Sequence, residues 1–239
     1  SGDGFRPEVH DSDGLSIASA SGEWIWRPLV NPKRLLTTSF SLPGVRGFGL
    51  MQRDRAFASY EDLEARYDLR PSLWVEPTSN WGPGRVELVQ IPTPDETNDN
   101  IVAYWVPEEA PKAGAALAYS YRLSAQKNSE RRPSTSWVAQ SRRGRGFQAL
   151  PDDAVKFNID FEGPALAQLP PGTDVEADLA LTNGVRQLLV VHPNEVRGGW
   201  RLVVQARRID KDKPMELRAH LRRGNQALSE TWSYIVPTP

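Results

Sequence analysis

Two short acidic clusters are the parts of this sequence best suited to chemistry. The first is His10-Asp11-Ser12-Asp13, and the second is Asp95-Glu96-Thr97-Asn98-Asp99-Asn100. Two carboxyl groups in one cleft are what the hydrolysis of a glycosidic bond requires, because one protonates the leaving oxygen while the other activates water or attacks the sugar ring. Short acidic loops also form Asx-turns and solvated connections, which is their commoner role. The clusters therefore leave a glycosidase site and a pair of ordinary loops as alternatives.

Tryptophan is concentrated near the same clusters. Five of the eight Trp residues precede residue 108, namely Trp24, Trp26, Trp74, Trp81 and Trp105. Trp and Tyr offer sugar rings an apolar face for C–H contacts and a polar edge for hydroxyl groups. We expect Trp24, Trp26 and Trp105 to lie in the core, whereas turn residues flank Trp81 in Asn80-Trp81-Gly82-Pro83-Gly84. Trp81 is therefore the better candidate for a surface contact.

The composition argues against several other kinds of site. The chain has no Cys, and its three His residues (His10, His192 and His220) are scattered, so we expect no metal site and no cofactor. Lys and Arg number 29 against 30 Asp and Glu, and the net charge of -1 does not favour nucleic acid as a partner. The basic run Arg142-Arg143-Gly144-Arg145 is typical of a solvated loop, with an anion site as the alternative.

Apolar runs are short throughout the chain. None approaches the roughly 18 apolar residues that a membrane span needs, because charges, Pro or Gly interrupt each run. We therefore expect no membrane span. The first residues, Ser-Gly-Asp-Gly-Phe, contain neither a basic nor an apolar segment, so we expect no export signal within the chain as given.

The second half of the chain alternates apolar and polar residues in the way that strands do. Val155, Phe157, Ile159 and Phe161 interleave with polar residues, as do Leu217, Ala219 and Leu221. Asn183-Gly184 is a hairpin turn signal. With further runs at 116–123, 175–179, 185–191, 200–206 and 232–236, the pattern predicts about seven strands and an immunoglobulin-like sandwich.

The first half is less regular but also reads as strands and loops. Short apolar pieces stand between loops rich in Pro, Asn and Asp, and Ser59–Tyr67 is the one plausible helical turn. Pro107–Gly114 combines Pro, Gly and charge and is typical of a linker. The sequence thus predicts an all-β protein with one domain at 1–107, a linker at 108–113 and a second domain at 114–239.

Long motifs in a fixed order resemble a known family. They are Phe5–Leu15 (FRPEVHDSDGL), Gly22–Leu29 (GEWIWRPL), Arg46–Leu50 (RGFGL), Tyr67–Val75 (YDLRPSLWV), Ile91–Thr93 (IPT), Glu96–Trp105 (ETNDNIVAYW), Gly199–Leu202 (GWRL) and Ser229–Tyr234 (SETWSY). These segments are similar to those of the osmoregulated periplasmic glucan biosynthesis proteins, the glucan G and D proteins. The resemblance covers this whole chain and about the C-terminal half of the family protein.

The resemblance implies a fold, a location and a substrate. It implies that residues 1–107 are the C-terminal part of a galactose-mutarotase-like β-sandwich, followed by an immunoglobulin-like β-sandwich. It implies a periplasmic protein that acts on β-1,2-linked glucan. The missing N-terminal half of the family fold, or a second chain, would then supply the partner strands and one wall of the glucan cleft, and a homodimer is a further possibility.

The same resemblance assigns roles to the acidic clusters. Members resemble inverting endo-β-1,2-glucanases, which implies that Asp99 is the general acid and Asp11 the general base acting through water. Glu96, Tyr67 and Arg70 match positions that line the cleft. His10, Asp13, Trp74 and Trp81 are assigned as further substrate contacts because they lie in or near the motifs. If inversion applies, we expect the carboxyl groups of Asp11 and Asp99 to lie at least about 6.5–9.5 Å apart.

Three kinds of function remain open at this point. The chain could form part of a glycoside hydrolase, a β-1,2-glucanase that is active when the N-terminal half is present. It could instead be a non-catalytic glucan-binding or biosynthesis factor that positions glucan for a synthase or a modifying enzyme. A protein used only for association with other proteins is the third class, and the intact acidic motifs favour the first two.

Overall fold

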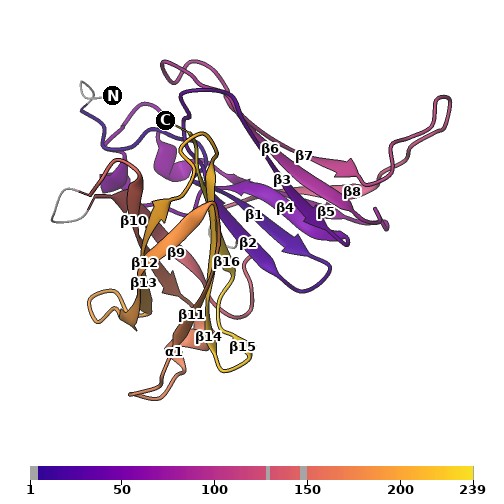
Figure 1. Ribbon diagram of the computed structural model, residues 1–239. Coiled ribbons are helices and arrows are strands. Elements are labelled where there is room, and N and C mark those ends of the chain that lie inside the picture. The colour runs from indigo at the N-terminus through magenta and orange to yellow at the C-terminus, as the bar shows by residue number, and fades with distance from the viewer. Residues whose placement is uncertain (1–4, 128–129, 146–149, 239) are drawn as a thin grey trace. The chain divides into compact units, whose positions relative to one another are not determined.

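The fold is all-β, as the sequence predicts. A computed structural model describes residues 5–127, 130–145 and 150–238. Among these residues it contains sixteen strands, two short 3-10 helices and one α-helix of a single turn (Figure 1). Contacts between residues divide the chain into two compact units. Unit 1 comprises the described residues of Ser1–Trp24 and Pro28–Arg131, and unit 2 those of Ile25–Arg27 and Arg132–Pro239.

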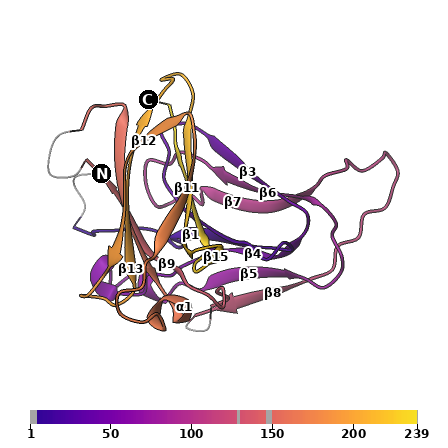
Figure 2. The same cartoon turned by 60° about the horizontal axis from the view of Figure 1, so that its bottom comes forward.

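Unit 1 consists of two antiparallel sheets. One has the order β1-β4-β5-β8, with β1 (Gly14–Ser19), β4 (Val45–Met51), β5 (Ser72–Pro77) and β8 (Tyr121–Gln126). The other has the order β3-β6-β7, with β3 (Leu36–Leu42), β6 (Gly84–Gln90) and β7 (Ile101–Pro107). Figure 2 shows the two sheets of this unit as two layers.

Alternating side chains form the core of unit 1. On β6 every second residue is buried, and Val86 and Leu88 are fully enclosed. Leu15 and Ile17 on β1 are equally enclosed. Apolar burial of this kind is the main stabilising contribution to a two-layer β-fold. The core thereby fixes the start of β1, which follows the first acidic cluster, and the end of β6, which precedes the second.

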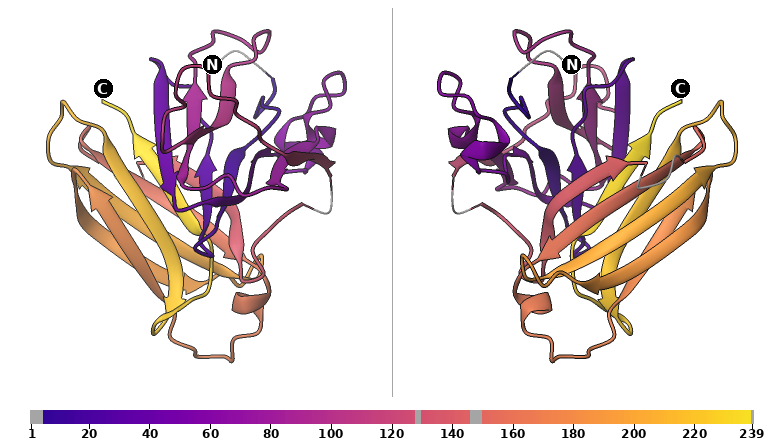
Figure 3. Two further views of the ribbon diagram at one scale, coloured as in Figure 1. Left: turned by 90° about the vertical axis from the view of Figure 1, so that its right-hand side faces the viewer. Right: turned by 90° about the vertical axis from the view of Figure 1, so that its left-hand side faces the viewer.

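Unit 2 also contains two sheets, and their strands after residue 131 run from salmon to yellow in Figure 3. The first has the order β12-β13-β10-β9, with β12 (Gly184–Pro193), β13 (Trp200–Arg208), β10 (Ala154–Glu162) and β9 (Trp137–Gly144). The second has the order β11-β14-β16-β2, with β11 (Glu176–Thr182), β14 (Met215–Arg223), β16 (Thr231–Val236) and β2 (Trp24–Pro28), and β15 (Gln226–Ala227) pairs with β14. The short helix α1 (Pro164–Ala167) follows β10.

The alternating strands predicted around 155–161 and 217–221 are confirmed, whereas the predicted run 116–123 is a strand only from residue 121. Val155, Phe157, Ile159 and Phe161 are buried on β10, and Leu217, Ala219 and Leu221 are buried on β14. Asn183 lies in the turn between β11 and β12 with φ +56°, the left-handed conformation that a tight hairpin requires.

The segment 59–67 and the expected linker 108–113 each connect strands of unit 1. The segment 59–67 is not helical along its length, because two 3-10 turns, η1 (Phe57–Ser59) and η2 (Tyr67–Leu69), stand at its ends. The expected linker 108–113 lies between β7 and β8, and β8 pairs with β5 over residues 121–126, so both strands belong to unit 1. A separable domain at 114–239 stays a prediction.

Candidate functional site

The second acidic cluster lies in a loop whose two ends are joined by hydrogen bonds between Ile91 and Asn100. We name residues 91–100, between β6 and β7, the acid loop. The β6–β7 ladder ends with the pair Gln90 and Ile101, and Pro92 and Pro94 then have no N–H to extend it. Below the loop, the Ile91 amide donates to the Asn100 carbonyl at 2.8 Å, and Asn100 Nδ2 donates to the Ile91 carbonyl at 2.9 Å. The loop is thus closed at its base.

Within the acid loop, Asp95 and Asp99 have different surroundings. Oδ1 of Asp95 accepts hydrogen bonds from the Thr97 hydroxyl at 2.6 Å and from the Thr97 amide at 3.0 Å, and these bonds lower the pKa of Asp95. Asp95 therefore serves the local turn, as the Asx-turn alternative predicts. Asp99 is exposed and directly precedes Asn100, which closes the base of the loop. All three acids of the loop, Asp95, Glu96 and Asp99, are exposed, but Asp95 is engaged by Thr97.

Glu96 joins the acid loop to the η2 turn. The Tyr67 hydroxyl donates to Glu96 Oε2 at 2.5 Å, and Arg6 Nη1 donates to Oε1 at 2.9 Å and to Oε2 at 2.7 Å. The hydrogen bond from Tyr67, followed by that from Arg6, lowers the pKa of Glu96, so the carboxylate stays ionised. Sequence reasoning missed Arg6, although it lies in the quoted motif Phe5–Leu15.

Asp11 also contacts the η2 turn. Oδ1 of Asp11 lies 3.1 Å from Nε of Arg70, and the guanidinium of Arg70 stands over the Tyr67 ring at 5.7 Å from its centroid. The side chains of Asp11 and Arg70 are 58% and 46% exposed. Asp11, Arg70, Tyr67 and Glu96 thus form one connected group that links the two acidic clusters at the surface.

His10 directly precedes Asp11 and is half-buried. Its Nδ1 lies 3.1 Å from Oε1 of Gln52, its Nε2 lies 2.9 Å from Oε2 of Glu8, and its ring meets Tyr60 edge to face. Burial opposes protonation of His10, but the carboxylates of Glu8 and Asp13 outweigh burial and raise its pKa. His10 therefore supports the segment that carries Asp11.

Asp13 has a structural environment. Its Oδ2 accepts hydrogen bonds from the amides of Arg53 at 2.8 Å and Asp54 at 2.7 Å, which hold the chain after β4. Its Oδ1 is buried and has no hydrogen-bond partner among the described residues. Burial raises the pKa of Asp13 to about 6. Its contacts indicate that Asp13 orders the chain at residues 53–54.

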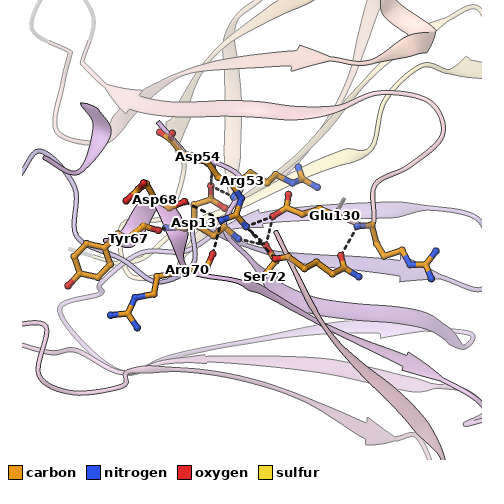
Figure 4. A network of polar contacts seen from close by, with 12 residues as sticks. Asp13, Arg53, Asp54, Tyr67, Asp68, Arg70, Ser72 and Glu130 are labelled. Carbon is orange, nitrogen blue, oxygen red and sulfur yellow. Dashed lines mark hydrogen bonds and ion pairs between the residues drawn. The ribbon is translucent and has the colours of Figure 1, made fainter. Parts of the chain in front are cut away.

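A network of polar contacts joins the η2 turn to neighbouring segments of unit 1 (Figure 4). Gln52, fully buried, donates through Nε2 to the His10 carbonyl at 2.9 Å and to the Tyr67 carbonyl at 3.1 Å. Arg55 donates to the Arg70 carbonyl at 2.7 Å and to Glu130 at 3.1 Å. Neither Gln52 nor Arg55 has a sequence pattern that marks it, because each acts on residues distant along the chain.

The two tryptophans assigned as substrate contacts lie elsewhere. Trp74 is 3% exposed and stacks on Trp24 with ring centroids 5.6 Å apart, so it packs in the core of unit 1. Trp81 precedes β6 while the acid loop follows it, and a strand of this length spans about 20 Å. Trp81 contacts Trp105, Tyr119 and Tyr121 instead. The structure does not bring these two rings to the acidic groups.

The described residues contain neither a candidate metal site nor a candidate membrane-spanning helix. No group of three or more His, Cys, Asp or Glu in that part of the chain could hold a metal ion. No helix within residues 5–127, 130–145 and 150–238 is long and apolar enough to cross a membrane.

Comparison with known proteins places these motifs in context. The family model described as "Periplasmic glucan biosynthesis protein, MdoG" matches residues 1–236. The chain is 58% identical over 240 residues to "Glucans biosynthesis protein G" of Ralstonia nicotianae (strain ATCC BAA-1114 / GMI1000). That alignment covers 98% of this chain and 48% of the relative, so the chain spans about half of the relative's length.

Proposed function

Because the chain belongs to the periplasmic glucan biosynthesis protein MdoG family, we propose that it acts on β-1,2-linked glucan at the surface formed by Asp11, the η2 turn and the acid loop. One observation carries this proposal. A single turn binds both acidic clusters, since Arg70 pairs with Asp11 at 3.1 Å and Tyr67 donates to Glu96 at 2.5 Å. Two clusters more than 80 residues apart in sequence thereby share one exposed surface.

The proposed reaction is hydrolysis with inversion, as part of an endo-β-1,2-glucanase site. Asp99 gives its proton to the glycosidic oxygen as the bond to the anomeric carbon breaks. Water attacks that carbon from the opposite face and loses its proton to Asp11. Arg70 orients the Asp11 carboxylate, whose 58% exposure leaves room for the attacking water.

The other members of the group bind and position. Glu96 is held ionised by the Tyr67 hydroxyl and by Arg6, so it anchors the acid loop and does not serve as the proton donor. Tyr67 and Arg70 offer a ring face and a guanidinium, which suit C–H contacts and hydroxyl groups of a sugar. In this proposal, His10 and Asp13 act from below by fixing the backbone around Asp11.

The rest of the glucan cleft lies outside this chain in our proposal. The relative is about twice as long as the part that aligns. We propose that an N-terminal half like that of the relative, or a second chain, supplies the other wall of the cleft. Activity is therefore tested both on this chain and on a protein extended to the length of the relative.

A non-catalytic glucan-binding or biosynthesis factor is the second candidate function. Ion pairs at both clusters favour it, because Asp11 is paired with Arg70 and Glu96 with Arg6. In this alternative the same surface holds glucan for a synthase or a modifying enzyme.

Cleavage of linear β-1,2-glucan separates the two functions. We expect shorter products with reducing ends of inverted configuration, seen by chromatography and by NMR of the first product. Asp99→Asn and Asp11→Asn should each lower the rate at least about 1,000-fold and leave glucan binding within about threefold, because the amide keeps the shape but transfers no proton. Linear β-1,3-glucan is the control substrate. Binding without any cleavage would favour the non-catalytic factor, and retention of configuration would contradict the roles of Asp11 and Asp99.

A further inference from the structure

Arg6 connects a fixed part of unit 1 to the acid loop. One nitrogen of its guanidinium, Nη1, donates to Asp62 at 2.9 Å and to both oxygens of Glu96 at 2.9 and 2.7 Å. These partners lie 56 and 90 residues further along the chain. A single side chain thus joins three segments that are remote in sequence.

The Asp62 end of this connection is buried and held by hydrogen bonds within its own loop. Asp62 is 5% exposed, and its Oδ1 accepts the amides of Glu64 and Ala65, each at 2.8 Å. A carboxylate that accepts two backbone N–H groups has one preferred orientation. Arg6 is therefore anchored on a fixed acceptor, with its own side chain 24% exposed.

The Glu96 end lies in the exposed part of the acid loop. Asn100 closes the base of the loop, and Asn31 holds Thr93 through bonds of 2.7 and 3.1 Å. Thr93 in turn donates from its hydroxyl to the Asp95 carbonyl at 2.7 Å, within the loop. Among the described residues, the hydrogen bonds that join the segment 95–99 to residues outside the acid loop are those that Glu96 accepts from Arg6 and Tyr67. Asp99 lies three residues after Glu96 in this segment.

We infer that Arg6 is a positioning residue: it transmits the fixed orientation of Asp62 to Glu96 and so holds Asp99 in place for the reaction. This inference rests on the proposed function for its catalytic part, while the ordering of the loop by Arg6 is independent of it. Misplacement of a reacting group by about 1 Å can lower a rate about 100-fold without loss of substrate contacts.

Three substitutions test the connection. Arg6→Gln removes the charge, Arg6→Lys keeps it, and Asp62→Asn disturbs the anchor without touching the loop, because its amide oxygen can still accept the two backbone N–H groups. Arg131→Gln is the matched control, since Arg131 pairs with Glu76 at 3.3 Å in the same unit and is exposed. Thermal unfolding of each variant verifies that it folds.

The first measurement is the order of the acid loop in solution, from 15N relaxation of the amides of residues 96–99. We expect order parameters near about 0.85 in the unsubstituted chain and below about 0.6 in Arg6→Gln and Asp62→Asn. Arg6→Lys should stay near the unsubstituted value, and so should Arg131→Gln. Unchanged order in a folded Arg6→Gln variant would overturn the inference, whether or not the protein cleaves glucan.

The second measurement separates positioning from binding. In the glucan cleavage assay, Arg6→Gln should lower kcat about 10- to 100-fold and change KM less than about threefold, and Arg6→Lys should restore kcat to within about threefold of the original. A loosened loop with an unchanged kcat would refute the positioning role. If neither the unsubstituted chain nor the protein extended to the length of the relative cleaves glucan, the proposed hydrolysis fails, and the order parameters alone decide whether Arg6 holds the loop.

Discussion

Gln52→Met is the most informative single change beneath the site. Met has nearly the length and shape of Gln but cannot make its hydrogen bonds. Gln52 is fully buried, and its amide joins the His10 carbonyl at 2.9 Å, the Tyr67 carbonyl at 3.1 Å and His10 Nδ1 at 3.1 Å. The substitution therefore removes three side-chain hydrogen bonds and leaves their partners without a replacement.

The expected cost follows from these bonds. A buried hydrogen bond contributes about 1 kcal/mol net, so three bonds give about 3 kcal/mol in the free energy of unfolding, with a range of about 2–4 kcal/mol. For a protein of this size, that corresponds to a fall in Tm of about 6–12 °C. Because Gln52 links the Asp11 segment to the η2 turn, the same change should also weaken glucan binding.

Urea denaturation followed by tryptophan fluorescence measures this cost. Gln205→Met is the matched control, since Gln205 Nε2 donates to Gln187 at 2.9 Å near the surface of unit 2. We expect the control to change stability by less than about 0.5 kcal/mol. A cost below about 1 kcal/mol for Gln52→Met, or a cost equal to that of the control, would show that the network does not hold the turn.

The remaining predictions concern pH, the tryptophans and the domain boundary. The pKa of Asp13 is raised from 3.8 to about 6, so its contribution to stability is present below about pH 4 and is lost as pH rises to about 6, an effect of up to about 3 kcal/mol. Asp13→Asn should remove this loss. Urea denaturation between about pH 4 and pH 6 should therefore show the free energy of unfolding of the variant rising relative to that of the original chain. A difference between the two free energies that does not change with pH would contradict the burial of the carboxyl group. Trp74→Ala should lower the free energy of unfolding by about 3–5 kcal/mol, because this ring is 3% exposed. Trp81→Ala should leave the rate of glucan cleavage within about threefold of the original. A large loss of rate with Trp81→Ala would place that ring in the glucan path. Brief trypsin treatment should cut the chain at the exposed Lys112. Size-exclusion chromatography should then show the two fragments still associated, because β8 pairs with β5 over six residues. Fragments that separate without denaturant would instead support a domain boundary at 108–113.

Local features of the fold could be predicted from the sequence. The strands β10 and β14 follow from period-two alternation, and the turn at Asn183-Gly184 follows from the left-handed conformation that Asn and Gly tolerate. The turn around Asp95 follows from the tendency of Asp to bind the amide two residues later. Each of these depends on residues only a few positions apart, which is the range over which a sequence pattern carries information.

The sequence also determined the family through its ordered motifs, and with it the candidate residues Asp11, Asp99, Glu96, Tyr67 and Arg70. It did not determine which of them meet. The pairs Arg70 with Asp11 and Tyr67 with Glu96 form because the segments before β1, between β4 and β5, and after β6 lie together in unit 1.

Tertiary structure alone decided the supporting residues and the position of the tryptophans. Arg6, Gln52 and Arg55 contact partners that lie from 13 to 90 residues away in the sequence. The Trp74 ring packs in the core, whereas Trp81 lies just before β6, at the end of that strand opposite to the acid loop. A hydrogen bond forms only when its donor and acceptor lie about 3 Å apart. Sheet order, which depends on how all the strands bury their apolar faces together, sets those distances, and no local pattern in the sequence specifies it.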